Sequence, residues 1–227
     1  MTKRSVSLRA GAMLALATLV WPGQGAAQQQ VTLTGVNGVN AHGVYIGPYF
    51  GSTPGMPTLD LICDDYLDGV NIGDTWNAYF TNVGSGILGG SLLGQTRWGQ
   101  VFGTGATDMY VRAIWLAEQL GTQPTSQWSG IHGALWDTFT GYGPGWSEDA
   151  AWSARADSVQ QGLLPGLPTA DQLQYWYVVT DVNTVNGVGG KQEYLTYITP
   201  EPATLILLGT GMIGLLGFTA IVRRTAV

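Results

Sequence analysis

Hydrophobic and polar residues alternate in short segments after residue 27, and glycines interrupt them often. Residues 31–51 read VTLTGVNGVNAHGVYIGPYFG, which predicts two short strands with turns near Gly38 and Gly47. Residues 59–70, LDLICDDYLDGV, begin as an apolar strand and end in an acidic turn. Residues 74–83, DTWNAYFTNV, alternate again and predict a further strand, whereas the glycine-rich stretch that follows predicts a loop.

The spacing of apolar residues becomes helical further along the chain. Residues 108–121 predict a helix that Asp108 can cap and Gly121 can end. Residues 126–143 and 147–162 predict two more helices. Ser147 is the expected cap of the last of them. One face of the first helix carries the apolar residues Met109, Ala113, Ile114, Ala117 and Leu120.

Strand patterning returns in residues 172–182 and 191–199, with a glycine-rich turn between them. The order of strands, then helices, then strands predicts an α+β fold, a β-rich sheet or barrel with an inserted helical segment. The 172 residues from 28 to 199 are enough for one domain with its own core.

The N-terminal residues 1–27 have the layout of a cleaved secretory signal peptide. A basic segment with Lys3, Arg4 and Arg9 precedes an apolar stretch that is too short to span a bilayer. Small residues at 25–27 then offer a cleavage site. The alternative is a buried N-terminal helix, but all three parts of a signal peptide occur in order.

The C-terminal residues predict a transmembrane helix. Residues 204–222 carry no charge and are long enough to cross a bilayer. Arg223 and Arg224 follow at once and place that end in the cytoplasm. Just before the helix, the two prolines of Pro200-Glu201-Pro202 keep the chain extended and outside the helix.

Pro-Glu-Pro, a membrane helix and an arginine pair, in this order over residues 200–227, resemble the PEP-CTERM sorting signal of Gram-negative bacteria. The resemblance implies an exosortase as partner, a membrane-embedded protease that cleaves near Pro200-Glu201-Pro202. It also implies an inner-membrane anchor before cleavage and the cell surface or an exopolysaccharide matrix afterwards. The alternative is a plain C-terminal anchor that is never processed.

The domain between the two ends is strongly acidic. Residues 28–199 hold fourteen acidic side chains and four basic ones, a net charge of −10. Nucleic acid is an unsuitable partner for such a surface because phosphate contacts need Lys and Arg.

The acidic turn allows a calcium interpretation, with Asp64, Asp65 and Asp68 as candidate ligands. The EF-hand spacing fails, because Tyr66 and Thr75 stand where that loop needs oxygen-rich side chains. The alternative is a solvated acidic turn that protects a strand edge. We therefore expect no metal and no cofactor.

Enzyme chemistry finds little support in the residues. His42 and His132 are the only histidines, and neither GxSxG nor HExxH occurs. We therefore expect a non-enzymatic protein. The domain is rich in Trp, and Trp146 between a glycine and a serine is the candidate for an exposed aromatic that stacks on sugars.

Cys63 is the only cysteine, so the chain has no internal disulfide. ICDD, residues 62–65, and IHGALW, residues 131–136, resemble two blocks of other PEP-CTERM ectodomains and of the thioester domains of Gram-positive surface adhesins. In those adhesins the cysteine sulfur bonds the carbonyl carbon of a glutamine side chain, and this thioester is the electrophile that host amines attack, with the thiol as leaving group. His132 stands where that family has the glutamine, so this pair cannot form the thioester.

Three interpretations of Cys63 remain open. It is a buried apolar residue on a strand, or it contacts His132, which would lower the thiol pKa and make a reactive or metal-binding thiolate with Asp64 or Asp65. The third is a thioester to another glutamine, such as Gln127. The sequence as a whole predicts an exported, exosortase-sorted protein, with a carbohydrate-binding or adhesive module as the alternative role.

Overall fold

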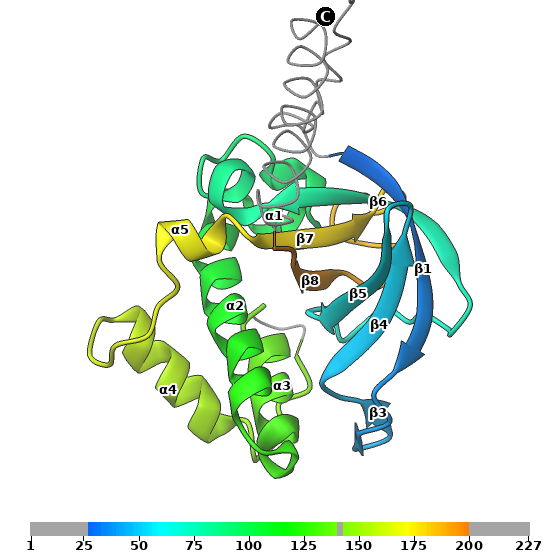
Figure 1. The fold of residues 1–227 in the computed structure, drawn as a ribbon. Helices are drawn as coiled ribbons and strands as arrows, with labels where there is room; N and C mark the ends of the chain where they lie inside the picture. The colour runs from blue at the N-terminus through cyan, green and yellow to red at the C-terminus, as the bar shows by residue number, and fades with distance from the viewer. Residues whose placement is uncertain (1–26, 140–142, 200–227) are drawn as a thin grey trace, which may run out of the picture.

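The computed structural model describes residues 27–139 and 143–199, in which six antiparallel strands close into one barrel (Figure 1). Helices pack beside the barrel, and a single hydrophobic core runs through both parts. The predicted α+β class is therefore confirmed. Around the barrel the strands follow the order β1 (Ala27–Val36), β4 (Pro48–Thr53), β5 (Met56–Cys63), β8 (Tyr194–Tyr197), β7 (Trp176–Asp181) and β6 (Thr75–Asn82).

Alternation in the sequence decides which side chains face the barrel interior. In β6, Trp76, Ala78 and Phe80 are buried, while Thr75 and Asn77 are exposed. The two-residue period of a strand places alternate side chains on opposite faces, so one face joins the core. Strand β7 departs from this pattern, because five of its six residues are buried. The helical segment covers that side of the barrel (Figure 1).

Along the chain, a small hairpin of β2 (Asn40–Ala41) and β3 (Val44–Tyr45) connects β1 to β4. The sequence predicted turns near Gly38 and Gly47, and both glycines have a positive φ. The hairpin was missed because each of its strands has only two residues. The predicted glycine-rich loop after β6 instead contains two single helical turns, η1 (Val83–Ile87) and η2 (Leu93–Gln95).

All three predicted helices are present. The structure places them at α2 (Ala106–Thr122), α3 (Trp128–Asp137) and α4 (Ala150–Gln160). Two further short helices, α1 (Arg97–Phe102) and α5 (Ala170–Leu173), were not predicted.

The expected helix caps differ from those in the structure. Helix α2 begins two residues before Asp108, which lies in its first turn instead of at its cap. Helix α4 begins at Ala150 with Asp149 in the cap position, so the prediction for Ser147 was wrong. Boundaries of this kind depend on neighbouring elements, which the local pattern does not contain.

Glycines inside α3 let the start of α4 approach closely. A Cβ atom on Gly130 would lie 2.6 Å from the carbonyl oxygen of Glu148, and one on Gly133 would lie 3.0 Å from Asp149 Oδ2. Such distances are shorter than van der Waals contact. The glycines that weakened the helix prediction are therefore packing positions.

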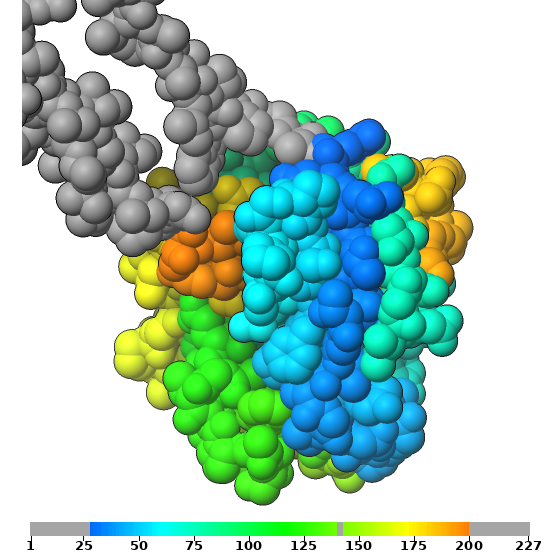
Figure 2. All heavy atoms as spheres, turned by 45° about the vertical axis from the view of Figure 1, so that its right-hand side comes forward, coloured from blue at the N-terminus to red at the C-terminus, as the bar shows by residue number. Residues whose placement is uncertain are grey.

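The two ends of the domain lie at the same end of the barrel (Figure 1). Strand β1 begins there, and β8 leads out towards Thr199, while the β2–β3 hairpin lies at the opposite end. Figure 2 shows β5 beside β8 on the outer face, in cyan and orange. The predicted signal peptide 1–27 (apart from Ala27) and the predicted transmembrane helix fall outside the described residues. Within those residues, no helix is both long and apolar enough to cross a membrane.

Candidate functional site

A buried arginine joins the helical segment to the barrel. Arg97 is the first residue of α1, and only 2% of it is exposed. Its Nε lies 3.1 Å from Asp65 Oδ2, and its second ion pair joins Nη1 to Asp68 Oδ2 at 2.6 Å. Asp65 and Asp68 follow β5, so these ion pairs connect the end of a barrel strand to a helix far away in the sequence.

The same guanidinium also fixes the loop between β7 and β8. Arg97 donates hydrogen bonds to the carbonyl oxygens of Gly187 at 2.8 Å, Gly189 at 2.8 Å and Lys191 at 3.1 Å. Gly187 has a φ of 77°, and a Cβ there would lie 2.1 Å from Val101 Cγ2. Only glycine therefore allows this loop to approach α1 closely enough for the arginine to bind it.

Glu193 is a further buried acidic residue at this junction and is fully inaccessible. Its carboxylate accepts hydrogen bonds from the Arg97 backbone N at 2.6 Å, the Tyr110 hydroxyl at 2.6 Å and the Thr180 hydroxyl. Burial raises the pKa of Glu193, while these three donors and the nearby guanidinium stabilise its ionised form. Barrel strands and α2 are thereby joined through one carboxylate.

Asp64 has a different environment from its neighbours. It is fully buried, and neither of its carboxylate oxygens has a hydrogen-bond partner in the structure. Burial, followed by the nearby Glu193 and Asp65, raises the pKa of Asp64 well above its usual value. Burial without a hydrogen-bond partner therefore favours the protonated form of this carboxyl, because an isolated buried carboxylate is costly.

The interpretation as a solvated acidic turn is therefore wrong for Asp64 and Asp65, which are both fully buried, whereas Asp68 is half-buried. The guanidinium of Arg97 pairs with Asp65 and Asp68 and so occupies the place that a calcium ion would take between these carboxylates. In residues 27–139 and 143–199, no group of three or more His, Cys, Asp or Glu side chains could hold a metal ion. Two of the three candidate calcium ligands, Asp65 and Asp68, are thus engaged in ion pairs with Arg97.

Cys63 and His132, whose contact the sequence left open, meet through the Cys63 backbone. Both residues are fully buried, Cys63 at the end of β5 and His132 in α3. The backbone N of Gly47 donates to His132 Nδ1 at 2.7 Å, so Nδ1 carries no proton. Nε2 then carries the proton and donates it to the Cys63 carbonyl oxygen at 2.8 Å. His132 is consequently a neutral bridge between β5 and the segment before β4.

Gly47 is required at this contact for two reasons. Its φ of 83° suits glycine, and a Cβ would lie 2.5 Å from both Asn37 Nδ2 and the Trp128 ring. Because the chain passes so close to α3, its N–H reaches the imidazole. Burial lowers the pKa of His132 to about 4, so the ring stays neutral over the physiological range.

The thiol of Cys63 does not take part in the histidine contact. Its Sγ donates to the Asp65 carbonyl oxygen at 3.0 Å. Burial, together with the nearby Asp65, raises the pKa of the thiol well above its usual value. The interpretation of a thiolate activated by His132 was therefore wrong, because the imidazole meets the backbone and not the sulfur. The thiol is a buried weak donor on a strand.

Aromatic rings extend from His132 towards the hairpin end of the domain. The ring centroids of His132 and Trp136 are 4.3 Å apart, and those of Trp136 and Trp146 are 5.6 Å apart. Trp146 also lies 4.3 Å from the His42 ring and 6.2 Å from the Tyr66 ring. We call His42, Tyr66, Trp136 and Trp146 the aromatic cluster.

Trp146 is half-buried in this cluster, so it is less exposed than the sequence suggested. Its neighbour His42 is exposed at the tip of the β2–β3 hairpin and pairs with Glu148, which precedes α4. The contact lowers the pKa of Glu148. The cluster therefore ties the hairpin to the α3–α4 connection while leaving part of its aromatic surface open to solvent.

A pair of aspartates lies beneath the same connection. Asp149 is buried next to Asp137, whose Oδ1 accepts a hydrogen bond from the Gly145 backbone N at 3.1 Å. Burial, with Asp137 as the next cause, raises the pKa of Asp149 to about 6. At neutral pH this carboxyl is therefore mostly ionised, although burial and the neighbouring Asp137 disfavour the ionised form.

Arg97 and Glu193 were missed by the sequence analysis. The available signal was composition, because Arg97 is one of only four basic residues in an acidic domain. The spacing of the apolar residues gave no indication that either charge is buried. The predicted sorting residues Pro200, Glu201, Pro202, Arg223 and Arg224 lie outside the described residues.

Comparison with protein families identifies the C-terminal segment. Residues 199–224 match the family model described as "PEP-CTERM protein-sorting motif". No curated protein and no solved structure matches the chain. The resemblance to thioester domains finds no support in these comparisons. The chain therefore carries the sorting motif of exosortase substrates, directly after its last barrel strand.

Removal of the Arg97 guanidinium should strongly destabilise the domain. Arg97→Met leaves Asp65 and Asp68 without their counter-charge, which should cost roughly 3–5 kcal/mol in the free energy of unfolding. Urea-induced unfolding of residues 28–199 measures the change. The control is Arg155→Met, because Arg155 is exposed and lies 4.6 Å from the Trp152 ring centroid. It should lose at most about 1 kcal/mol, and equal losses in both variants would contradict the role of Arg97.

His132 should make the domain less stable in mild acid. Well above pH 6.5 the imidazole is neutral in both states, but at lower pH the unfolded chain binds a proton that the native ring does not take up until about pH 4. Stability therefore falls between these values, by about 3 kcal/mol in total. His132→Gln can keep both hydrogen bonds without titrating, so its melting temperature should decrease less from pH 7 to pH 4.5. Parallel curves would refute this account.

Proposed function

We propose that residues 28–199 form a non-enzymatic module that an exosortase sorts and releases outside the cytoplasmic membrane. The observation that carries this proposal is the position of the sorting motif. Its match begins at Thr199, and the last strand of the barrel ends at Tyr197. Cleavage after this point would leave every strand of the barrel in place.

The proposed route begins with the signal peptide, residues 1–27. The apolar residues 204–222 then hold the precursor in the inner membrane, with Arg223 and Arg224 on the cytoplasmic side. Processing near Pro200-Glu201-Pro202 would release the domain to the cell surface or to an exopolysaccharide matrix. The acidic composition of the domain suits a soluble protein at a surface.

The contacts of the histidines support a non-enzymatic role. Both ring nitrogens of His132 are used in buried hydrogen bonds, so this residue cannot act as a proton acceptor without unfolding its surroundings. His42 pairs with Glu148 beside an aromatic ring. The thiol of Cys63 is inaccessible and protonated. None of these groups is available as a nucleophile with a general base beside it.

A carbohydrate-binding or adhesive role is the second candidate, and the place of the aromatic cluster favours it. The β2–β3 hairpin that carries His42 lies at the opposite end of the domain from the exit of the chain (Figure 1). In the anchored precursor this end would point away from the membrane. Partly exposed rings of Trp146 and Tyr66 beside an acidic side chain could then stack on sugars of the matrix.

We also propose that a degenerate thioester module underlies this fold. The contact between β5 and α3 supports the idea, since His132 faces the backbone of Cys63 from the position where the related adhesins have glutamine. Covalent attachment is outside this proposal, because imidazole has no amide carbonyl that could accept the sulfur.

The sorting proposal is tested by the C-terminus of the mature protein. In cells with the exosortase, mass spectrometry of the full chain should find a product that has lost the apolar C-terminal segment. The double variant Pro200→Ala and Glu201→Ala should remain as the membrane-bound precursor. Pro165→Ala is the control, since Pro165 lies in a loop outside the motif. Identical masses with and without exosortase would disprove the proposal.

The carbohydrate role is tested by retention on exopolysaccharide purified from the producing cells. Trp146→Ala removes one stacking surface and should weaken retention by about fivefold, corresponding to roughly 1 kcal/mol. Tyr197→Ala is the control, because Tyr197 is an aromatic residue with 47% exposure near the other end of the domain. If wild type and Trp146→Ala bind equally, the aromatic cluster has no such function.

A further inference from the structure

The barrel has an opening between β5 and β8. These strands pair only through Ile62 with Leu195 and Cys63 with Tyr194. Beyond Leu195, β8 stays with β7 instead, because Tyr197 pairs with Trp176 and the Ile198 backbone N donates to Tyr175 O at 2.8 Å. The β5 residues from Met56 to Leu61 therefore lie beside the opening, and in the described residues none of them forms a strand pair with β8.

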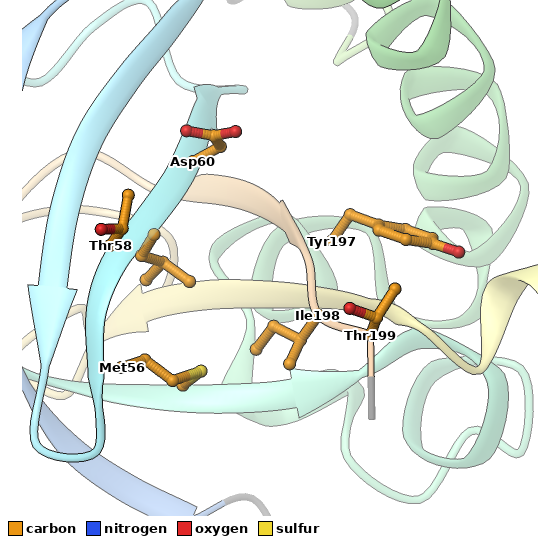
Figure 3. A pocket seen from close by; sticks show the side chains of 7 residues that line it. Met56, Thr58, Asp60, Tyr197, Ile198 and Thr199 are labelled. Atoms are coloured by element: carbon orange, nitrogen blue, oxygen red, sulfur yellow. The ribbon is translucent and has the colours of Figure 1, made fainter. Parts of the chain in front are cut away.

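A pocket of about 240 Å³ occupies this opening. Figure 3 shows Met56, Thr58 and Asp60 along one strand and Tyr197, Ile198 and Thr199 along the other. Leu59 completes the lining. The pocket thus combines three apolar side chains with hydroxyl groups and one exposed carboxylate. Figure 2 shows the two strand segments that form it side by side on the outer face.

Backbone groups of β5 point into the opening. The Asp64 backbone N donates to Glu193 O at 3.2 Å, and the Asp60 carbonyl oxygen accepts from Thr196 Oγ1 at 2.7 Å. Alternate residues of a strand direct their N–H and C=O groups towards the same neighbour, so those of Thr58 face the same side. An extended peptide could therefore pair with β5 at this point.

The sorting motif begins at the wall of this pocket. Thr199 is both a lining residue and the first residue of the match. Each residue of an extended chain spans at most about 3.6 Å, so Pro202 lies within about 11 Å of Thr199. A protease that binds Pro200-Glu201-Pro202 therefore acts close to the barrel surface around the pocket.

We propose that this β5–β8 pocket is a docking site for an extended segment of the exosortase. The proposal rests on the processing proposed above and deepens it, because it adds a folded surface to the linear motif. The segment would pair with the Thr58 backbone and insert an apolar side chain between Met56, Leu59 and Ile198. A basic side chain beside it would meet Asp60, in keeping with the net charge of −10 on residues 28–199.

Filling the pocket tests the proposal without changing the motif. Thr58→Trp in the full chain places a large ring in the opening, and Thr34→Trp is the matched control on β1, where Thr34 is also exposed. In cells with the exosortase, pulse-chase labelling measures the rate at which precursor is converted. We expect Thr58→Trp to be processed about fivefold more slowly, as for loss of a central interface contact, and the control to match wild type.

A charge reversal gives an independent variant. Asp60→Lys should also slow conversion, whereas Asp171→Lys, at an exposed position in α5, should not. Urea-induced unfolding of each variant separates a docking defect from a folding defect. Slow conversion together with unchanged stability in both pocket variants supports the proposal.

Several outcomes would overturn it. Conversion of Thr58→Trp and Asp60→Lys at the wild-type rate would show that the pocket is not used. So would normal processing of residues 199–227 attached to an unrelated domain. A change of oligomeric state in Thr58→Trp would assign the pocket to a second copy of the chain instead. If wild type itself is never cleaved, sorting and docking both fail. A processing defect limited to the double variant Pro200→Ala and Glu201→Ala leaves the sorting proposal standing and rejects docking.

Discussion

The ion pair of buried Arg97 with Asp65 is the interaction on which the rest of the architecture depends. It connects the end of β5 to the start of α1, and the same guanidinium holds the loop that leads into β8. Glu193 in that strand segment then binds the Arg97 backbone and Tyr110 of α2. A domain with few charges thus uses several of them inside, where the dielectric is low and each pairing has a large effect.

This buried network also explains the state of the residues around Cys63. Arg97 pairs with Asp65, whereas the carboxyl of the neighbouring Asp64 has no hydrogen-bond partner, and burial raises its pKa. The adjacent His132 is neutral for the same reason, since burial penalises every unpaired charge. The junction of β5 and α3 is therefore held by hydrogen bonds between neutral groups, which makes it a rigid structural joint and not a reactive centre.

The proposed functions divide the domain into two ends. The chain leaves the barrel at Thr199, beside the β5–β8 pocket, so contacts with the membrane and the processing protease belong to that end. The aromatic cluster lies towards the other end with the β2–β3 hairpin (Figure 1). Because the sorting motif follows the barrel so closely, we assign the end at Thr199 to processing. The end with the aromatic cluster is then the surface on which the released protein would bind a ligand.

The sequence by itself determined the sorting motif, the α+β class, five of the barrel strands and the three longer helices. These features are local, because side-chain periodicity and the order of Pro-Glu-Pro can be read within a few residues. Only the tertiary structure decided that Asp64 and Asp65 are buried, that Arg97 and Glu193 join barrel and helices, and that His132 meets the carbonyl of Cys63 and not its sulfur. The physical reason is that each of these contacts joins residues far apart in the chain, and burial and pairing depend on what the fold places around a side chain.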